Sequence, residues 1–519
     1  MSETPAQPAG QNPDVGWALD DLNQRAKALK RRRDYYEGRH VSVIPPGKTL
    51  SPLLQELLED LVDNLCDDVV DEPVARLSIT NWTDPSMADT ADLPDDDTED
   101  TPGTPPAPEQ VNRGELAQDL WDTNRGQTRA NATHRDGWRS GDAWNIVERA
   151  KDGTVRWFPQ RPECMAARYQ EDNPDTLDVV AKVWKSGRAY RMNLYYGPDS
   201  AGGGRLERWA SAGSSHDGGA PQAKAFVQMT STTDDGTRDW PRIPVFHFPA
   251  DEVGGYGRSV LTDVIPLQDL LNKSVADLVV AMEDVALPQR YGTGIQTSYE
   301  PDGTETPLRR RARSAADMLT TASKDAAFGQ FPGADMSQFL SVQTAWRLEI
   351  ARKGYLPAYS VAGPTGSSST PASGLSMLVQ EGRLLKRCKN AQEDWGWVWT
   401  EQMAYMLTLS GTPTVPADLD LEWAPIATRD ETALWELLTL KSGLGVPKRQ
   451  VLMEGGYDQD QVDDWLDAEA TAPGGRLGFP GTGIGGVASI TMPGVSGGVA
   501  VPADALLPPQ PVGAQAPAA

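Results

Sequence analysis

The sequence predicts an α+β fold, in which helices and an antiparallel sheet occupy separate stretches of the chain. Two observations predict it. Residues 251–290 and 374–409 carry apolar residues at helical spacing over unusually long stretches. Residues 143–248 hold short runs rich in β-branched and aromatic residues, separated by Gly, Ser and Asp, as in strands joined by hairpins. A chain of 519 residues is long enough to fold as several subdomains.

The first long stretch, Asp251–Arg290, is the clearest helix. Its apolar residues recur every three or four positions, which places one apolar stripe along a helix. About 25–30 helical residues span roughly 37–45 Å, long for a helix inside one globular core. Pro266 marks a kink or the first turn, and Pro288 ends the helix. The stripe comprises Val260, Val264, Leu267, Leu271, Val275, Leu278 and Met282.

The N-terminal part is predicted to be mostly helical after a disordered start over residues 1–16, which are rich in Pro, Ala and Gln. A helix then runs from Trp17 to about Gly38 through the basic run Lys30–Arg33. This run could contact phosphates, but we favour the interpretation that it forms a charged face of the helix. Ser51 and Pro52 are typical of a helix start, and the apolar residues that follow extend that helix to Leu65.

Two further features precede the sheet. Residues 84–110 hold nine Asp or Glu and no Lys or Arg, with prolines among them, which predicts an exposed acidic loop. Apolar and polar residues alternate from Ala75 to Ile79, in a run that ends at Trp82. Leu116–Arg139 predicts another helix, with Gly126 as its weak point.

The sheet region begins with a hairpin. Two apolar runs, 143–148 and 155–158, flank a Lys-Asp-Gly turn at 151–153. Polar Gly/Ser/Asp segments at 199–204 and 211–220 separate later strands. The further strands are predicted at Leu177–Trp184, Arg188–Tyr196, Arg205–Trp209, Ala225–Met229 and Pro244–Phe248.

After the first long helix, residues 291–330 are irregular and include a strand candidate at Tyr291–Tyr299. Ser337–Tyr355 predicts a helix. Pro357–Ser373 then gives no packing signal, and such a loop inside a folded region is usually functional or disordered. A second very long helix is predicted from Gly374 to Leu409.

The C-terminal part is predicted to hold three short helices, at Asp430–Lys441, Pro447–Met453 and Asp458–Ala468, with glycines at the breaks. From residue 471 onward the chain is rich in Gly, Pro, Ala and Val and almost without charge, which predicts a disordered tail.

Composition limits the classes of function that the protein can have. The net charge of −25 argues against a basic face that clamps DNA, although an acidic protein can surround DNA that must slide. Three distant cysteines fit a reducing compartment. The start of the chain lacks the pattern of a signal peptide, and no window reaches about 18 uninterrupted apolar residues, so we expect a soluble protein without a membrane partner.

No motif predicts catalysis, a cofactor or a metal site. The four histidines are scattered, with none at metal-ligand spacing. Gly363–Ser369 is rich in Gly and Ser but lacks the Lys of a phosphate-binding loop, and the G-x-G-x-x-G match at Gly481–Gly486 has no strand before it. We therefore expect that the protein is not an enzyme.

The collinear order of these elements resembles the portal proteins of tailed bacteriophages, over roughly residues 17–470. No single motif carries the resemblance. It rests on a set of stretches in the same order: Asp34–His40 (DYYEGRH), Val74–Trp82 (VARLSITNW), Gly141–Val147 (GDAWNIV) and Gly257–Arg290, which runs from GRSVL through the Asn272-Lys273 pair to ALPQR.

The resemblance implies a portal fold with a wing, a stem, a clip, a tunnel loop and a helical crown, assembled as a ring of about twelve subunits. The Ser259–Ala286 helix would be the first stem helix. The implied segments are a disordered N-terminus at 1–16, the wing at 17–250, the first stem helix at 251–288, the clip and return segment at 289–336, the tunnel helix, tunnel loop 357–373 and long wing helix at 337–429, the crown at 430–470 and a disordered tail at 471–519.

The resemblance also implies site residues. The tunnel loop would form a weakly polar collar around DNA, with Arg352 and Lys353 as a sparse basic ring just before it. Four clip arginines would contact DNA or an acidic patch of a partner: Arg309, Arg310, Arg311 and Arg313. The loop residues are Tyr359, Ser360, Val361, Ala362, Gly363, Pro364, Thr365, Gly366, Ser367, Ser368, Ser369 and Thr370. A surface linker, a solvated helix end and a solvated basic loop are the respective alternatives.

As a portal, the protein would sit at one vertex of the virion capsid after assembly in the host cytoplasm. It would conduct double-stranded DNA packaged by the terminase large subunit, and would contact the head–tail adaptor and the major capsid and scaffolding proteins. Two alternatives stay open: another phage head morphogenesis or adaptor protein without a channel, and a metal-dependent nuclease with scattered carboxylates.

Overall fold

The computed structural model divides the chain into two compact units, Met1–Thr428 and Arg429–Ala519. The structure describes residues 4–8, 12–41, 62–87, 111–198, 203–211, 223–230, 237–238, 240–251, 255–286, 290–293, 327–330, 336–362, 374–427, 431–457, 461–463 and 465–466.

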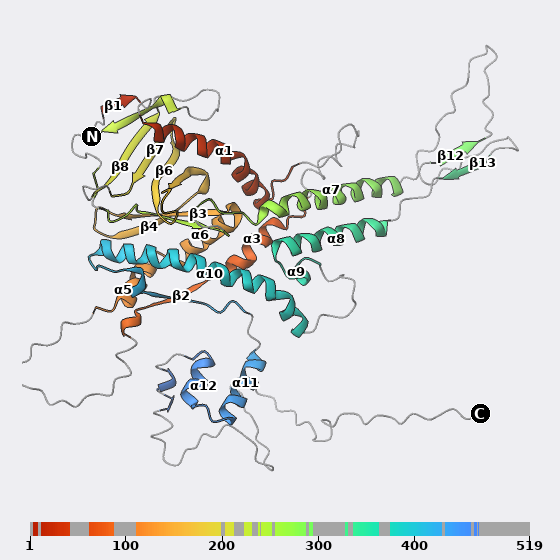
Figure 1. The fold of residues 1–519 in the computed structure, drawn as a ribbon. Coiled ribbons are helices and arrows are strands. Elements are labelled where there is room, and N and C mark those ends of the chain that lie inside the picture. The colour runs from red at the N-terminus through yellow and green to blue at the C-terminus, as the bar shows by residue number, and fades with distance from the viewer. Residues whose placement is uncertain are drawn as a thin grey trace, which may run out of the picture. The chain divides into compact units, whose positions relative to one another are not determined.

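The first unit contains a large antiparallel sheet in the order β1-β9-β8-β7-β6-β5, with β10 paired to β8 (Figure 1). Consecutive strands β5 to β9 pair with one another, as expected for a sheet built from hairpins. The strands are β1 (Thr4–Pro8), β5 (Met165–Tyr169), β6 (Leu177–Ser186), β7 (Ala189–Tyr196), β8 (Gly204–Ser211), β9 (Phe226–Thr230) and β10 (Thr237–Arg238), with short 3-10 turns η2 (Pro162–Cys164) and η3 (Ala223–Ala225).

Helix α1 (Pro13–Tyr36) covers one face of this sheet. The Asn12 side chain caps it by accepting a hydrogen bond from the Asp14 backbone N–H at 2.9 Å, and Pro13 occupies the first turn. Its buried residues Val15, Leu19 and Leu22 pack with inward-facing residues of the sheet. The predicted helix is thus confirmed, and it begins four residues earlier than Trp17.

A second sheet, β11-β3-β4, lies between the large sheet and helix α10 (Gly374–Ser410) (Figure 1). It consists of β3 (Asp142–Arg149), β4 (Val155–Gln160) and β11 (Val245–Pro249). The predicted β3–β4 hairpin is confirmed, with Trp144 paired to Gln160 and Arg149 to Val155. The first six residues of β3 are all buried, because both faces of this strand are covered.

The main core joins the second sheet to the helices around α10 (Gly374–Ser410). Its tryptophans cluster around Trp399, which is 1% exposed and contacts the rings of Trp121 and Trp157 at 5.4 and 5.1 Å. The other elements of this core are α3 (Cys66–Ala75), β2 (Ile79–Thr83), α5 (Arg113–Thr123), α6 (Gly126–Ser140), η4 (Pro416–Asp418) and β14 (Asp420–Trp423), which pairs with β2.

Helices α7 (Leu261–Ala286) and α8 (Met336–Gly354) run side by side away from this core (Figure 1). Beyond them, β12 (Arg290–Thr293) pairs antiparallel with β13 (Ala327–Gln330). Helix α7 continues through Pro266, so the proline lies in the first turns without ending the helix. Helix α9 (Ala358–Ala362) follows α8. Both predicted long helices are confirmed, as is the helix between them.

The second unit contains α11 (Glu431–Gly443) and α12 (Lys448–Glu454), followed by helical residues at 461–463 and 465–466. Leu438, Val451 and Val462 are its buried apolar residues among those described. Two of the three predicted short helices are confirmed. The third, Asp458–Ala468, is confirmed at residues 461–463 and 465–466, and its other residues lie outside the described part of the chain.

Four expectations need correction or fall outside the structure. Residues 1–16 are not disordered throughout, because Thr4–Pro8 pair as a strand with β9 and backbone hydrogen bonds at a sheet edge do not require apolar side chains. Residues 62–65 are not helical, and the helix begins at Cys66 instead. Residues 42–61, where the predicted helix from Ser51 lies, are not described. The helix predicted over Leu116–Arg139 is two helices, separated at Arg125, which has a φ of 54°.

The acidic segment 84–110 is not exposed at its start. The Asp84 carboxylate is buried and accepts hydrogen bonds from the Ser86 hydroxyl and backbone N–H and from the Arg113 backbone N–H. These donors lower the pKa of Asp84 although its burial opposes the shift. Asp84 therefore fixes the start of α5 against the end of β2, and the remaining residues 88–110 lie outside the described part.

The core histidine His134 gives the first unit a predicted acid sensitivity. His134 is fully buried and accepts a hydrogen bond from the Trp399 indole N–H at 3.0 Å. Burial lowers the pKa of His134 from 6.5 to about 3. The neutral ring is therefore favoured in the fold, and its contribution is complete above about pH 6.5 and lost as the pH falls toward about 3. By about pH 4.5 this residue alone should remove roughly 2–3 kcal/mol of stability.

Urea unfolding of the wild-type chain and His134→Gln between neutral pH and about pH 4.5 measures this effect, because the difference between them removes the contribution of the acidic residues. We expect the variant to lose less stability on acidification than the wild type. Equal losses would contradict the role given to His134.

Candidate functional site

The site predicted from the sequence lies where α8 ends and α10 begins, and the end of α8 is tightly fixed. A Cβ on Gly354 would lie 2.5 Å from the Val69 side chain, so α8 and α3 can approach this closely only at a glycine. Tyr355 follows with a φ of 64°, and the Leu356 backbone N–H donates to the Ala351 carbonyl at 2.9 Å. This left-handed residue stops the helix and turns the chain back.

Helix α9 corrects the expected conformation of the loop. We predicted that residues 357–373 would lack packing, yet residues 358–362 form α9 and Val361 is 6% exposed. The Tyr359 hydroxyl donates a 2.5 Å hydrogen bond to Glu381 of α10, and Glu381 pairs with Arg76 at 3.3 Å. Burial, together with the neighbouring Glu381, raises the pKa of Tyr359 to about 12. Helix α9 is therefore held by the hydrogen bond from Tyr359 to α10 and by the burial of Val361 in the main core.

Two cations, Arg352 and Lys353, were predicted to form a basic pair at the end of α8, and one of them is paired with a carboxylate. The Arg352 guanidinium pairs with the Glu349 carboxylate at 2.7 Å. Hydrogen bonding to Arg352 lowers the pKa of Glu349, and the same bond raises the pKa of Arg352. Lys353 is exposed. Glu349 therefore offsets much of one of the two charges, and the basic ring stays a prediction.

Most of the other predicted site residues lie outside the described residues. This applies to residues 363–373 of the loop and to Arg309, Arg310, Arg311 and Arg313. The structure does bring the two ends of the segment 294–326 together, because β12 and β13 pair from Arg290–Gln330 to Thr293–Ala327. The strand candidate at Tyr291–Tyr299 is confirmed for its first three residues.

Sequence analysis did not single out the cations that α10 contributes to this site. The guanidinium carbons of Arg383 and Arg387, both on α10, lie 4.9 and 4.4 Å from the centre of the Tyr355 ring. Lys386 lies between them in the sequence and is exposed. The signal was present as four cations within Arg383–Lys389 in a strongly acidic chain, but it was hidden inside a long apolar helix pattern.

The basic run Lys30–Arg33 serves contacts within the first unit. Arg31 pairs with Asp269 of α7 at 2.9 Å, Arg33 pairs with Glu163 at 3.1 Å, and Arg32 donates to the Ser140 carbonyl at 2.7 Å. These partners join α1 to α6, α7 and η2. The run is therefore engaged in the fold, in agreement with the favoured prediction of a charged helix face.

A buried polar network fixes the base of α7. The Gln268 side chain accepts from the Leu65 backbone N–H at 3.1 Å and donates to the Asn272 side chain at 2.9 Å. Asn272 in turn lies 2.7 Å from the His40 ring nitrogen, and His40 stacks on Tyr35 at 4.5 Å. The stretches around Asp34–His40 and Asn272 therefore meet in space, although more than 200 residues separate them in the sequence.

Comparison with known proteins identifies the family. Residues 16–472 match the family model described as "Phage portal protein, SPP1 Gp6-like". The chain belongs to this phage portal protein family. A solved chain described as "Neck of native GTA particle computed with C12 symmetry" is similar, with 15% sequence identity and a TM-score of 0.37, and the match covers 81% of the portal chain and 99% of that chain. No curated protein matches the sequence.

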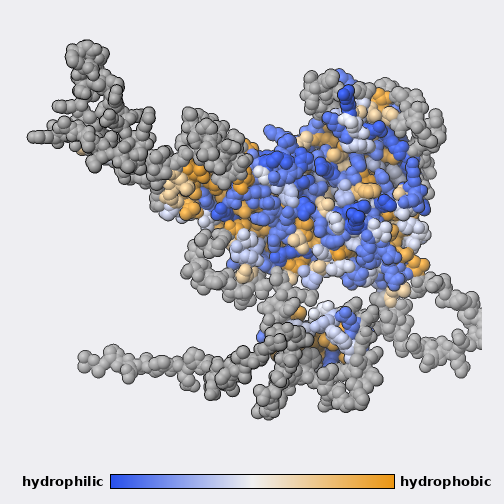
Figure 2. All heavy atoms as spheres, turned by 180° about the vertical axis from the view of Figure 1, so that it is seen from behind, coloured by the Kyte–Doolittle hydropathy of each residue, from blue (hydrophilic) through white to orange (hydrophobic). Residues whose placement is uncertain are grey.

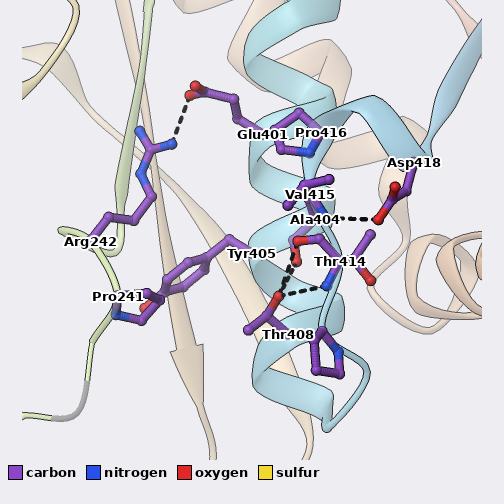
Figure 3. Close-up of a pocket in the computed structure, with 11 residues that line it drawn as sticks. Pro241, Arg242, Glu401, Ala404, Tyr405, Thr408, Thr414, Val415, Pro416 and Asp418 are labelled. Carbon is purple, nitrogen blue, oxygen red and sulfur yellow. Dashed lines mark hydrogen bonds and ion pairs between the residues drawn. The ribbon is translucent and has the colours of Figure 1, made fainter.

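A separate cavity of about 390 Å³ lies at the C-terminal end of α10 in this portal chain (Figure 3). Arg242 and Glu401 pair at its rim at 2.9 Å, and Tyr405 and Thr408 line it from α10. The cavity contains none of the predicted site residues. Within the described part of the chain, no group of three or more His, Cys, Asp or Glu could hold a metal ion, and no helix is long and apolar enough to span a membrane.

Proposed function

We propose that the protein forms a ring of about twelve subunits at one vertex of a phage capsid and conducts double-stranded DNA during packaging and ejection. The observation that carries the proposal is the match to the portal family over residues 16–472. The match favours the portal over the alternative of a head adaptor without a channel. The proposed partners are the terminase large subunit, the head–tail adaptor and the major capsid and scaffolding proteins, with assembly in the host cytoplasm.

Each part of the chain receives a proposed role. Helix α7 is the first stem helix and α8, which packs along it, is the tunnel helix. The segment joined through β12 and β13 is the clip, where Arg309, Arg310, Arg311 and Arg313 contact DNA or a partner. The proposed segments are the wing at 17–250, the first stem helix at 251–288, the clip and return segment at 289–336, the tunnel helix, loop and long wing helix at 337–429, the crown at 430–470 and the tail at 471–519.

Exposed apolar residues support the ring. Met282 of α7 and Leu340 and Val342 of α8 are 56%, 55% and 45% exposed. Figure 2 shows hydrophobic residues gathered on the α7–α8 pair, at the left of the view. A clustered apolar surface of this kind is typical of a contact with another protein. In a closed ring, the neighbouring stems would cover it, with different faces of α7–α8 meeting at each junction.

The charge distribution supports a channel that lets DNA slide. Each phosphate that a protein neutralises adds affinity through counterion release, so a conduit needs few fixed cations. The loop 357–373 contains no Lys or Arg, and the whole chain carries −25. The proposal is that twelve copies of this neutral loop form a collar that contacts DNA weakly. Hydrolysis of ATP would belong to the terminase, and we assign no enzymatic activity to this protein.

Negative-stain electron microscopy combined with the light-scattering mass of the purified protein tests the ring. We expect rings of about twelve subunits with a central hole, because neighbouring stems bury the apolar ends of α7 and α8. The double variant Leu340→Gln/Val342→Gln should shift the protein toward monomers. The matched variant Val379→Gln, at an apolar residue of α10 that is 73% exposed, should leave the ring intact.

A compact dimer or tetramer without a hole would contradict the conduit. A wild-type monomer calls for the same measurement after co-expression with the scaffolding protein, and a monomer under those conditions as well would also contradict it.

A further inference from the structure

Three exposed cations at the junction of α8 and α10 form no ion pair with a carboxylate in the part of the chain that the structure describes. They are Lys353 at the end of α8, and Arg383 and Lys386 near the start of α10. Among the residues that the structure describes, none of the three has an Asp or Glu within ion-pair distance. Arg352 adds a fourth cation, paired with Glu349. We call these four residues the basic junction.

The fold brings the basic junction together from two helices. The Arg383 guanidinium lies over the Tyr355 ring at 4.9 Å, two residues after Lys353. Lys386 is nearly one turn further along α10, a separation at which helical side chains are neighbours. Arg387 differs, because its side chain is only 10% exposed and pairs with Asp251 at 3.1 Å. Arg387 therefore anchors α10, whereas Arg383 and Lys386 face the solvent.

The chemistry of the basic junction suits phosphates. In a chain of net charge −25, a cluster with more cations than carboxylates creates a local positive potential that attracts a polyanion. The cations are exposed and come from two different helices. This arrangement suits contact with the phosphates of a DNA backbone, which does not depend on the base sequence. They also flank both ends of the segment 363–373, which carries no charge of its own.

We infer that Lys353, Arg383 and Lys386 contact the backbone phosphates of double-stranded DNA on either side of the loop 357–373. The inference rests on the proposed function, since it places these residues beside the channel. It keeps Lys353 of the predicted pair and replaces Arg352 with Arg383 and Lys386 of α10, because Arg352 is already paired with Glu349.

An acidic protein segment is the competing ligand, and the acidic residues 88–110 of this chain are the obvious candidate. DNA is favoured as the ligand, because the proposed channel would bring its phosphates past both ends of the loop, and the acidic peptide is kept as an outcome of the test.

The test compares two double variants with equal charge change. In Arg383→Gln/Lys386→Gln the junction loses two cations. In Lys185→Gln/Arg188→Gln two exposed cations of the β6–β7 turn are lost instead. Fluorescence anisotropy with a short labelled DNA duplex, measured on the ring over a series of salt concentrations, gives the affinity and its salt dependence. We expect the junction variant to bind about tenfold more weakly, with a shallower salt slope, and the control to match the wild type.

Equal weakening in both variants would overturn the inference, because net charge alone would then explain it. Loss of binding to a peptide of residues 88–110, with DNA affinity unchanged, would assign the junction to an acidic protein segment and also overturn it. A ring that binds no DNA at low salt would overturn the inference while leaving the ring itself in place. Electron microscopy of the same samples separates these outcomes from a failure to assemble, which would count against the proposed function.

Discussion

Substituting Ala for Gly141 should destabilise the first unit by about 2–5 kcal/mol. Gly141 ends α6 with a φ of 93°, a conformation that costs about 1–2 kcal/mol for other residues. A Cβ there would also lie 2.4 Å from the Gly257 carbonyl oxygen. Relieving such a contact typically costs another 1–3 kcal/mol. Gly257 is equally confined, because its own Cβ would lie 2.1 Å from the Gly141 carbonyl oxygen.

This backbone crossing lies where the second sheet meets the start of α7. The Ala250 N–H donates to the Gly141 carbonyl, and the Gly257 N–H donates to the Asp142 carboxylate, both at 2.8 Å. A forced separation would therefore displace the start of α7 relative to β3. For the proposed portal, a displaced α7 should also reduce ring assembly.

Gly153 provides the matched control for this prediction. It has a φ of 86°, similar to that of Gly141, but a Cβ at this position would meet nothing within 4 Å. Gly153→Ala should therefore cost only the backbone strain, about 1–2 kcal/mol. Urea unfolding of both variants separates strain from crowding. If Gly141→Ala cost no more than Gly153→Ala, the close crossing would have no energetic importance.

Trp399→Ala should remove about 3–5 kcal/mol of stability through the cavity left in the core. Trp399 packs on Phe248 at 4.8 Å in addition to Trp121 and Trp157, so its ring joins α10 to α5 and to strands β4 and β11 of the second sheet. Its loss would also leave His134 without the indole donor, and an unpaired buried polar group typically costs about 1–3 kcal/mol more.

The neighbouring Trp397 is the control, because it lies on the same helix and is 62% exposed. Trp397→Ala should change stability by less than about 1 kcal/mol. Trp399→Phe should keep most of the packing and lose the hydrogen bond, giving an intermediate cost. These values can be compared by urea unfolding of the full-length chain. A large loss for Trp397→Ala would indicate that this face is covered by another subunit.

Local sequence patterns determined much of the fold. Apolar spacing alone located α7, α8 and α10, since a helix of this length repeats its 3.6-residue period many times. Alternating strands around short Gly-containing turns located the hairpins of both sheets. The family was also recognised from the sequence, through the order of its stretches, and the match over residues 16–472 confirms it.

Tertiary structure decided what local patterns do not encode. Strand β1 exists because β9 offers an unpaired edge, and Asp84 is buried because Ser86 and Arg113 donate to it. Helix α9 is held by Glu381, and Arg352 is paired with Glu349, so neither the expected loop nor the expected basic pair is as simple as the sequence indicated.

At the candidate site, the sequence determined which types of residue are present, and the fold determined which of them meet. A neutral loop between a basic helix end and a long helix can be read from residues 352–374 directly. The cations Arg383 and Lys386 join that site only because Tyr355 turns the chain back against α10, a reversal fixed by its left-handed backbone and by the contact of Gly354 with Val69. Such long-range contacts depend on the packing of several elements at once, so no local pattern of residues predicts them.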